Sequence, residues 1–141
     1  MTNLIAEGLF RVDGERAVLF GSRRISTGVV KFPAERPELF EANPDIQSDI
    51  EPLELSTEGT LYTFTTQEFV PPLPYKGSRD PKTFRPYIVG FIELEEGLLV
   101  ESLIIDAAAG DLQIGQRMVS TTTMLETEAG ESLLTFAFRP A

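Results

Sequence analysis

The hydrophobic pattern of this chain changes character near Leu53. Beyond that point, apolar, aromatic and β-branched side chains gather in short runs that Gly and Pro separate, which is typical of consecutive β-strands. The first of these runs does not alternate cleanly between apolar and polar positions, so its β-branched and aromatic content carries the prediction. We expect five strands, at 59–70, 87–94, 98–105, 115–125 and 132–138.

The connections between these strands indicate how they fold together. Gly97 follows two glutamates between the second and third strands and predicts a tight hairpin. Residues 106–112 are interpreted as a short helical turn with Asp106 as its N-cap, and Gly90 within a strong strand predicts a bend or bulge. A long loop between the first two strands completes the element order of a five-stranded OB-fold barrel in a mainly β protein.

The first third of the chain is less regular. Residues 17–20 and 28–32 are predicted as two short strands on either side of a turn at 21–27. Prolines then interrupt the sequence, so residues 35–42 are expected to form a short helix at most. We therefore expect an N-terminal segment, 1–52, followed by the OB-fold barrel, 53–141.

Composition narrows the range of functions. The 141 residues suffice for one domain with its own core, and they include no Cys and no His. Their absence excludes disulfides and zinc sites of the usual Cys/His kind, and it removes the commonest general base. The N-terminus has no signal-peptide pattern, and no apolar run has the length to span a bilayer. We therefore expect a cytoplasmic protein that does not bind membranes, with no catalytic residues and no metal.

Charge is distributed unevenly along the chain. Twelve Lys and Arg against 22 Asp and Glu give a net charge of −10, which repels a nucleic-acid backbone. Every charged residue in 38–58 is acidic, whereas four cations and one anion lie within 71–89. A basic island on an acidic protein predicts a local anion site, and solvated loop charges explain the same pattern equally well.

Six stretches together resemble a known family: Leu19–Arg23, Gly28–Pro33, Glu58–Thr65, Pro86–Gly97, Leu112–Val119 and Phe138–Ala141. In this order they resemble the family long called domain of unknown function thirty-five, which pairs a rubredoxin-like zinc ribbon with a C-terminal OB-fold. The ribbon of that family carries two Cys-x-x-Cys knuckles. Here Arg24 and Thr27 have the spacing of the first pair, and the second falls in 38–43. We expect a degenerate, metal-free ribbon held by packing of Leu19, Phe20, Val29, Phe32, Leu39 and Phe40.

The resemblance also implies a function. Members of this family typically partner thiolase-like or hydratase-like enzymes that act on acyl-CoA, and they can help to hold CoA without being the catalyst. We therefore expect an accessory subunit without a resident cofactor, for which CoA or acyl-CoA is a candidate ligand. Cations for phosphates and aromatic rings for adenine gather in one loop. The candidate ligand-binding residues are Tyr75, Lys76, Gly77, Arg79, Lys82, Phe84 and Arg85, with Arg117 of the fourth strand as an addition or as a rim ion pair.

Three other interpretations stay open. An OB-fold can bind single-stranded nucleic acid or another ligand through stacking aromatics, here Tyr62, Phe64, Tyr87 and Phe91. A stand-alone enzyme would need the carboxylates at 93, 95 and 96, which flank a hairpin turn, or a serine at 22 or 78, which has no His to activate it. The chain could also be a pure interaction subunit or a homo-oligomer without a ligand.

Overall fold

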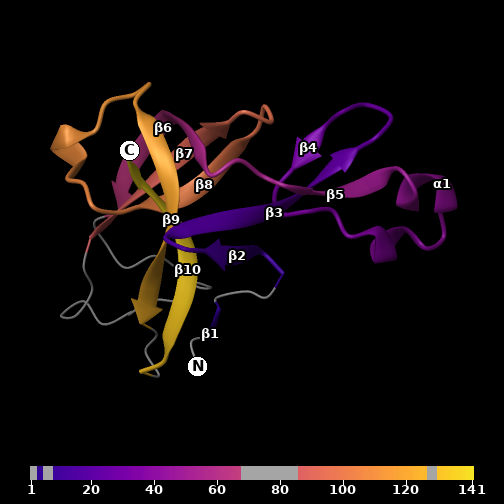
Figure 1. Ribbon diagram of the computed structural model, residues 1–141, viewed down its shortest axis with the longest axis horizontal. Helices are drawn as coiled ribbons and strands as arrows, with labels where there is room; N and C mark the ends of the chain where they lie inside the picture. The colour runs from indigo at the N-terminus through magenta and orange to yellow at the C-terminus, as the bar shows by residue number, and fades with distance from the viewer. Residues whose placement is uncertain (1–2, 5–7, 68–85, 127–129) are drawn as a thin grey trace.

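A computed structural model describes residues 3–4, 8–67, 86–126 and 130–141 (Figure 1). The strands are β1 (Asn3–Leu4), β2 (Phe10–Asp13), β3 (Arg16–Arg24), β4 (Val30–Lys31), β5 (Ile50–Glu54), β6 (Glu58–Gln67), β7 (Tyr87–Leu94), β8 (Leu99–Ile104), β9 (Arg117–Glu126) and β10 (Ser132–Pro140). The helical turns are η1 (Pro37–Phe40), α1 (Pro44–Gln47) and η2 (Ala109–Asp111). Within these described ranges, no helix is long and apolar enough to cross a membrane.

Five strands close into a barrel. They pair in the order β10–β8–β7–β6–β9, and β9 pairs with β10 as well, which closes the circle. All these pairs are antiparallel except β8 with β10, which run parallel where Ile104 faces Phe138. The predicted OB-fold is therefore confirmed. The short strand β1 adds to β10 in parallel.

The barrel strands contribute one side chain after another to a common core. Leu61, Ile92, Val100, Met118 and Phe138, one from each strand, are almost completely buried. Removing each such side chain from water contributes about 1.5–3 kcal/mol to stability. Buried positions recur at every second residue in β7 and β8, as expected for strands with one face on the core.

Two details of β6 and β7 depart from the sequence-based expectation. The register between them shifts between Leu61 and Thr63, so the extra residue of the bulge is Tyr62. Gly90, the predicted bulge, pairs regularly with Phe64 and Ser102. A Cβ on Gly90 would collide with the side chain of Ile104, so this glycine is needed for close packing rather than for a bend.

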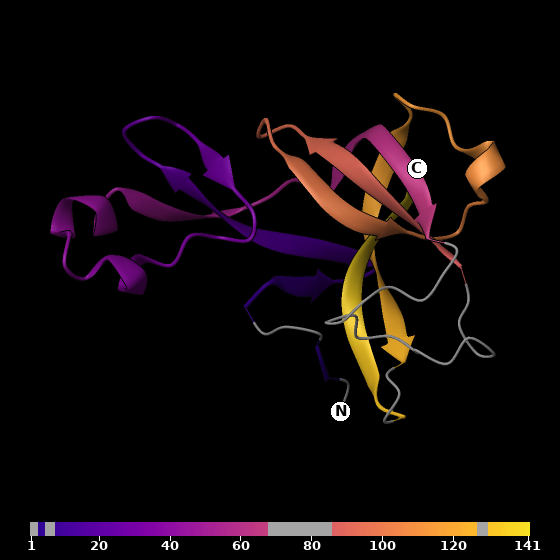
Figure 2. The same cartoon turned by 180° about the vertical axis from the view of Figure 1, so that it is seen from behind.

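The strand β3 links the barrel to a second sheet. Its first half pairs with β2 and its second half with β5, and β4 joins near its end. We call residues 20–54 the arm, because they extend away from the barrel in both views and carry α1 at the far end (Figures 1 and 2). Of the turn predicted at 21–27 only residues 25–27 form a turn, since pairing with β5 keeps the chain extended to Arg24.

The junction of arm and barrel combines apolar and polar contacts. Ala17 and Leu19 of β3 are fully buried in the core. The Oγ of Ser120 in β9 donates to the carbonyl of Ala17 at 2.7 Å and accepts from its N–H at 3.2 Å. Phe32, which follows β4, meets Phe136 of β10 edge to face at 5.6 Å between ring centroids. These contacts fix the base of the arm on the barrel.

Candidate protein-binding face and arm

The predicted ligand loop lies outside the described residues. Its predicted ligand-binding residues are Tyr75, Lys76, Gly77, Arg79, Lys82, Phe84 and Arg85. Arg117, the remaining candidate, lies at the start of β9, where its guanidinium donates to the carboxylate of Glu58 at 3.1 Å. Both side chains are about half exposed, so the rim ion pair that the sequence left open is present. A contact of Arg117 with the loop remains a prediction.

The outward side of β6, β7 and β8 is partly apolar. Tyr62 is 54% exposed, Phe91 39% and Leu99 43%. Phe91 stands opposite Thr63 and Glu101, and Leu99 stands opposite Glu93, so the strand register places these side chains on one side of the sheet. Tyr62, the unpaired residue of the bulge, is exposed next to Thr63. We call this surface the outer face. Of these positions, the sequence analysis had named Tyr62 and Phe91 as stacking residues.

The charged side chains that β6, β7 and β8 contribute to the outer face are acidic, and Arg117 of β9 lies at its edge beside Thr60. Glu93 and Glu101 are exposed beside its apolar side chains. The three strands that form it contain neither Lys nor Arg. Carboxylates repel a phosphate backbone, so this face does not support the nucleic-acid interpretation. An apolar patch with an acidic border fits instead a protein surface that combines apolar and basic side chains.

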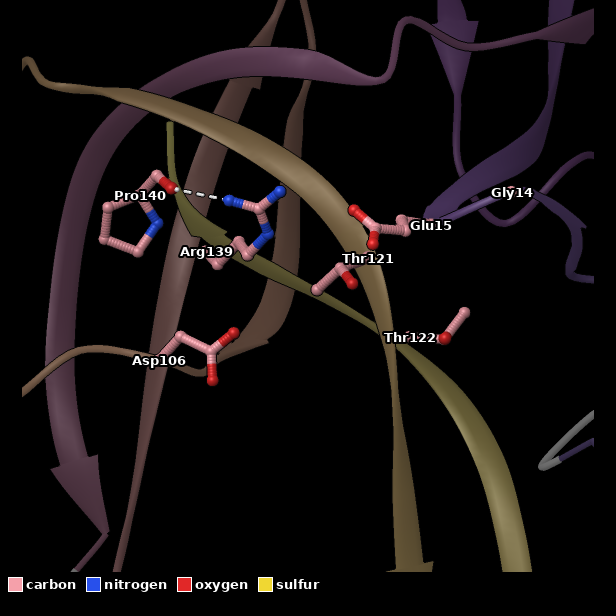
Figure 3. A pocket seen from close by; sticks show the side chains of 7 residues that line it. All are labelled: Gly14, Glu15, Asp106, Thr121, Thr122, Arg139 and Pro140. Atoms are coloured by element: carbon pink, nitrogen blue, oxygen red, sulfur yellow. Dashed lines mark hydrogen bonds between the residues drawn. The ribbon is translucent and has the colours of Figure 1, made fainter.

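A shallow polar hollow lies on another part of the barrel (Figure 3). It has a volume of about 530 Å³ and lies where the β2–β3 turn meets β9 and the end of β10. Its lining residues are Gly14, Glu15, Asp106, Thr121, Thr122, Arg139 and Pro140. Arg139 donates to the carbonyl of Pro140 at 3.2 Å. The carboxylates of Glu15 and Asp106 would repel the phosphates of CoA. None of the predicted ligand-binding residues lines the hollow.

Asp106 corrects another expectation. It has φ = 57°, a left-handed conformation that Asp adopts more readily than most residues. The helical turn η2 begins later, after Ala108, and has no side-chain cap. Asp106 is therefore not an N-cap, because it lies in a bend and the N-cap position of η2 is Ala108.

Two of the groups considered for catalysis, Glu96 and Ser22, have structural partners. The carboxylate of Glu96 accepts hydrogen bonds from the N–H of Ser56, at 3.2 Å, and from its hydroxyl, at 2.7 Å. Ser22 is buried, and its Oγ accepts the N–H of Glu35 at 2.8 Å. Ser78 lies outside the described residues. The geometry thus assigns Glu96 and Ser22 to holding loops in place.

The arm is packed differently from the predicted ribbon remnant. Leu19 is buried and Phe32 packs against the core, as expected. Val29 and Leu39, however, are 49% and 70% exposed, so the prediction that they hold the arm together is wrong. Phe40 lies beneath the guanidinium of Arg24 at 5.5 Å, a cation–π contact rather than an apolar one.

Comparison with known proteins identifies the barrel. Residues 53–123, half of the chain, match the family described as "ChsH2, C-terminal OB-fold domain". The chain therefore belongs to this family of OB-fold proteins, in agreement with the resemblance found from the sequence.

Similar proteins match over most of the chain. Two are called "DUF35 domain-containing scaffold protein", one from Methanocaldococcus jannaschii and one from Methanothermobacter thermautotrophicus. Each is 26% identical and matches 89% of this chain, covering 82% and 86% of the relative, respectively. A solved structure, "Ltp2-ChsH2(DUF35) aldolase", has a TM-score of 0.54 and 23% identity over 87% of this chain and 84% of that one. This last match supports the fold.

Proposed function

We propose that this protein is a non-catalytic accessory subunit that docks on a thiolase-like or hydratase-like enzyme of acyl-CoA metabolism. The observation that carries the proposal is the family of the barrel. The names of its relatives support it, since two are scaffold proteins and a solved neighbour is a complex of ChsH2 with an aldolase. The absence of Cys and His from the sequence agrees with leaving the chemistry to the partner.

The outer face is the part of the barrel that we propose to contact the enzyme. Tyr62, Phe91 and Leu99 supply apolar area, and aromatic side chains of this kind often dominate the energy of protein interfaces. Glu93 and Glu101 beside them favour an enzyme surface with Lys or Arg around an apolar centre. Among the described residues, these large apolar side chains stay partly open to solvent, and an enzyme surface would cover them.

The contribution to CoA binding is a second part of the proposal. It rests on the cations and aromatic residues of the loop 75–85, which suit phosphates and an adenine ring. The test is the double variant Lys76→Ala/Arg79→Ala, with Arg36→Ala on the arm as a control for loss of positive charge. Calorimetry with CoA should show at least about tenfold weaker binding for the double variant only, because two fewer cations then attract the phosphates. Equal affinity for CoA in wild type, the double variant and Arg36→Ala would show that the loop does not bind CoA.

Docking itself is tested by tagging the protein in its native cells and identifying the proteins that co-purify. Recovery of a thiolase-like or hydratase-like enzyme, and its loss with the variant Phe91→Ser, is the expected result. Phe91 is partly exposed on the barrel surface, so this variant should fold normally. If the enzyme binds wild type and Phe91→Ser equally well, the interface does not lie on the outer face.

A further inference from the structure

The outer half of the arm has no hydrophobic core. No side chain in residues 23–49 is buried, although the structure describes all of them, and within this range only Val30 and Phe32 pack against the barrel core. Two short helical turns, the end of β3 and the strand β4 nevertheless keep a defined arrangement there. Segments too small to bury apolar surface usually need a disulfide, a metal ion or another cross-link. Beyond the contacts of Val30 and Phe32, we therefore expect a cross-link to hold this part of the arm.

The guanidinium of Arg24 lies at the centre of the arm's polar contacts. It binds the carboxylate of Glu35 through two hydrogen bonds of 2.8 Å, the paired geometry that makes such contacts strong. Asp49 lies on another side at 3.9 Å, and the ring of Phe40 lies beneath the guanidinium. Lys31 is the remaining charged neighbour, 3.8 Å from Glu35. Arg24 thus joins β3 to three segments that follow it in the sequence.

Neighbouring hydrogen bonds extend this network. Asp49 accepts the N–H of Ser26 at 2.9 Å and its hydroxyl at 2.7 Å. The backbone carbonyl of Asp49 also accepts a hydrogen bond from the N–H of Ile25 at 2.8 Å. The backbone carbonyl of Arg24 accepts one from the N–H of Gly28 at 2.7 Å. The turn at 25–29 and the start of β5 are therefore tied to the same cluster.

The residues at this place do not suit a metal ion. The zinc ribbon of the family that the chain resembles holds a metal here, and Arg24 and Thr27 have the spacing of its first ligand pair. A guanidinium has no lone pair to donate and repels a cation. The soft thiolate and imidazole ligands that zinc prefers are absent from the sequence. In the described residues, no three Asp or Glu side chains are grouped to replace them.

We infer that the Arg24 guanidinium replaces the metal as the cross-link of the arm, so that the arm folds without metal and depends on charge. A metal cross-link responds to chelators. An ionic one responds to salt and to protonation of its carboxylates. This inference concerns the chain alone and holds or fails whether or not the proposed enzyme partner exists.

Acid should loosen the arm. Hydrogen bonds from Arg24 lower the pKa of Glu35 below its ordinary value of 4.5, against the opposing effect of desolvation. A lowered pKa means that the carboxylate stabilises the folded arm above pH 4.5, and that this contribution is lost as the pH falls through the folded-state value. Asp49 and Lys31 are the other titratable groups that face this pair.

Amide hydrogen exchange of the full chain tests the inference. In Arg24→Ala, the amides of Ile25 and Gly28 should exchange at least about tenfold faster, because the network that holds them is gone. The amide of Leu61, bonded to Gln116 in the barrel, should be unchanged and reports that the variant is folded. Arg24→Lys should be intermediate, since Lys keeps the charge but not the paired geometry.

A matched control is available at the base of the arm. Arg11 also binds a glutamate, Glu54, through two contacts of 2.6 and 3.3 Å. That pair is about half exposed, whereas the side chains of Arg24 and Glu35 are only 24% and 13% exposed. Arg11→Ala should leave exchange at the arm tip unchanged. If Arg24→Ala behaves like Arg11→Ala, the inference is wrong.

Metal is tested on the wild-type protein. Excess EDTA should not alter exchange at Gly28, whereas 1 M NaCl should increase it in wild type and not in Arg24→Ala. Faster exchange with EDTA, or zinc present in a one-to-one ratio in the purified protein, would show that a metal holds the arm after all.

Discussion

Replacing Ser120 by Ala should strongly destabilise the protein through two backbone groups that lie far away in the sequence. The Ser120 hydroxyl is fully buried and serves both the N–H and the carbonyl of Ala17, 103 positions earlier. Alanine removes only one oxygen, and it leaves both groups buried at the junction of β3 and β9. Each unsatisfied group costs about 1–3 kcal/mol, so the expected loss is about 3 kcal/mol.

Urea unfolding followed by circular dichroism and by tyrosine fluorescence measures this loss. A decrease of about 3 kcal/mol should lower the melting temperature by roughly 10 °C in a chain of this size. Ser132→Ala, the same chemical change at an exposed site on β10, should stay within about 0.5 kcal/mol of wild type. If Ser120→Ala loses no more than this control, the hydroxyl does not hold β3 on the barrel and the reasoning is refuted.

Two further changes test the backbone of the barrel. Gly59→Ala should cost about 1–3 kcal/mol in urea unfolding, because the new Cβ would lie 2.6 Å from the carbonyl oxygen of Glu93 and would force β6 and β7 apart; full stability would contradict this packing. Asp106→Gly should leave the melting temperature equal or higher, whereas Asp106→Val should destabilise by about 1–2 kcal/mol, because a β-branched residue is strained at φ = 57°; identical melting temperatures for the two variants would contradict the left-handed conformation.

The barrel was predictable from the sequence because local signals set its strands. Residues 87–94 form β7 as predicted, and Gly97, with φ = 87°, supplies the turn to β8. In these strands buried and exposed positions alternate, so the pattern of side chains is sufficient to find them. The resemblance to the family added the correct fold, which the match of residues 53–123 confirms.

The arm was harder to predict because distant pairing determines it. Strands β2 and β5 were not predicted, and β3 extends through residues expected to form a turn, since β5 pairs with it from about 30 residues away. A Cβ on Gly21 would lie 2.8 Å from the carbonyl of Lys31, so close approach of strands explains this glycine. The partners of Arg24 are 11 and 25 positions distant, and no local motif marks them.

The candidate site was predicted only in part for a similar reason. Tyr62 and Phe91 were recognised as aromatic residues of the barrel, but only the register of β6, β7 and β8 shows that Phe91 shares one side with Leu99 and that Tyr62 is a bulge residue. Whether Phe91 could stack on nucleic acid depends on the charge of the side chains around it. That charge became visible only when the strand pairing placed Glu101 beside it, and a carboxylate there repels phosphates.

Reconstitution of the complex tests the central claim most directly. The measurement is light scattering coupled to size-exclusion chromatography on this protein mixed with the purified enzyme that co-purifies with it. We predict a complex of defined stoichiometry for wild type and its loss for Phe91→Ser, while Ser132→Ala binds like wild type. Separate elution of wild type and enzyme at micromolar concentrations, or recovery of no acyl-CoA enzyme from native cells, would contradict the accessory-subunit function.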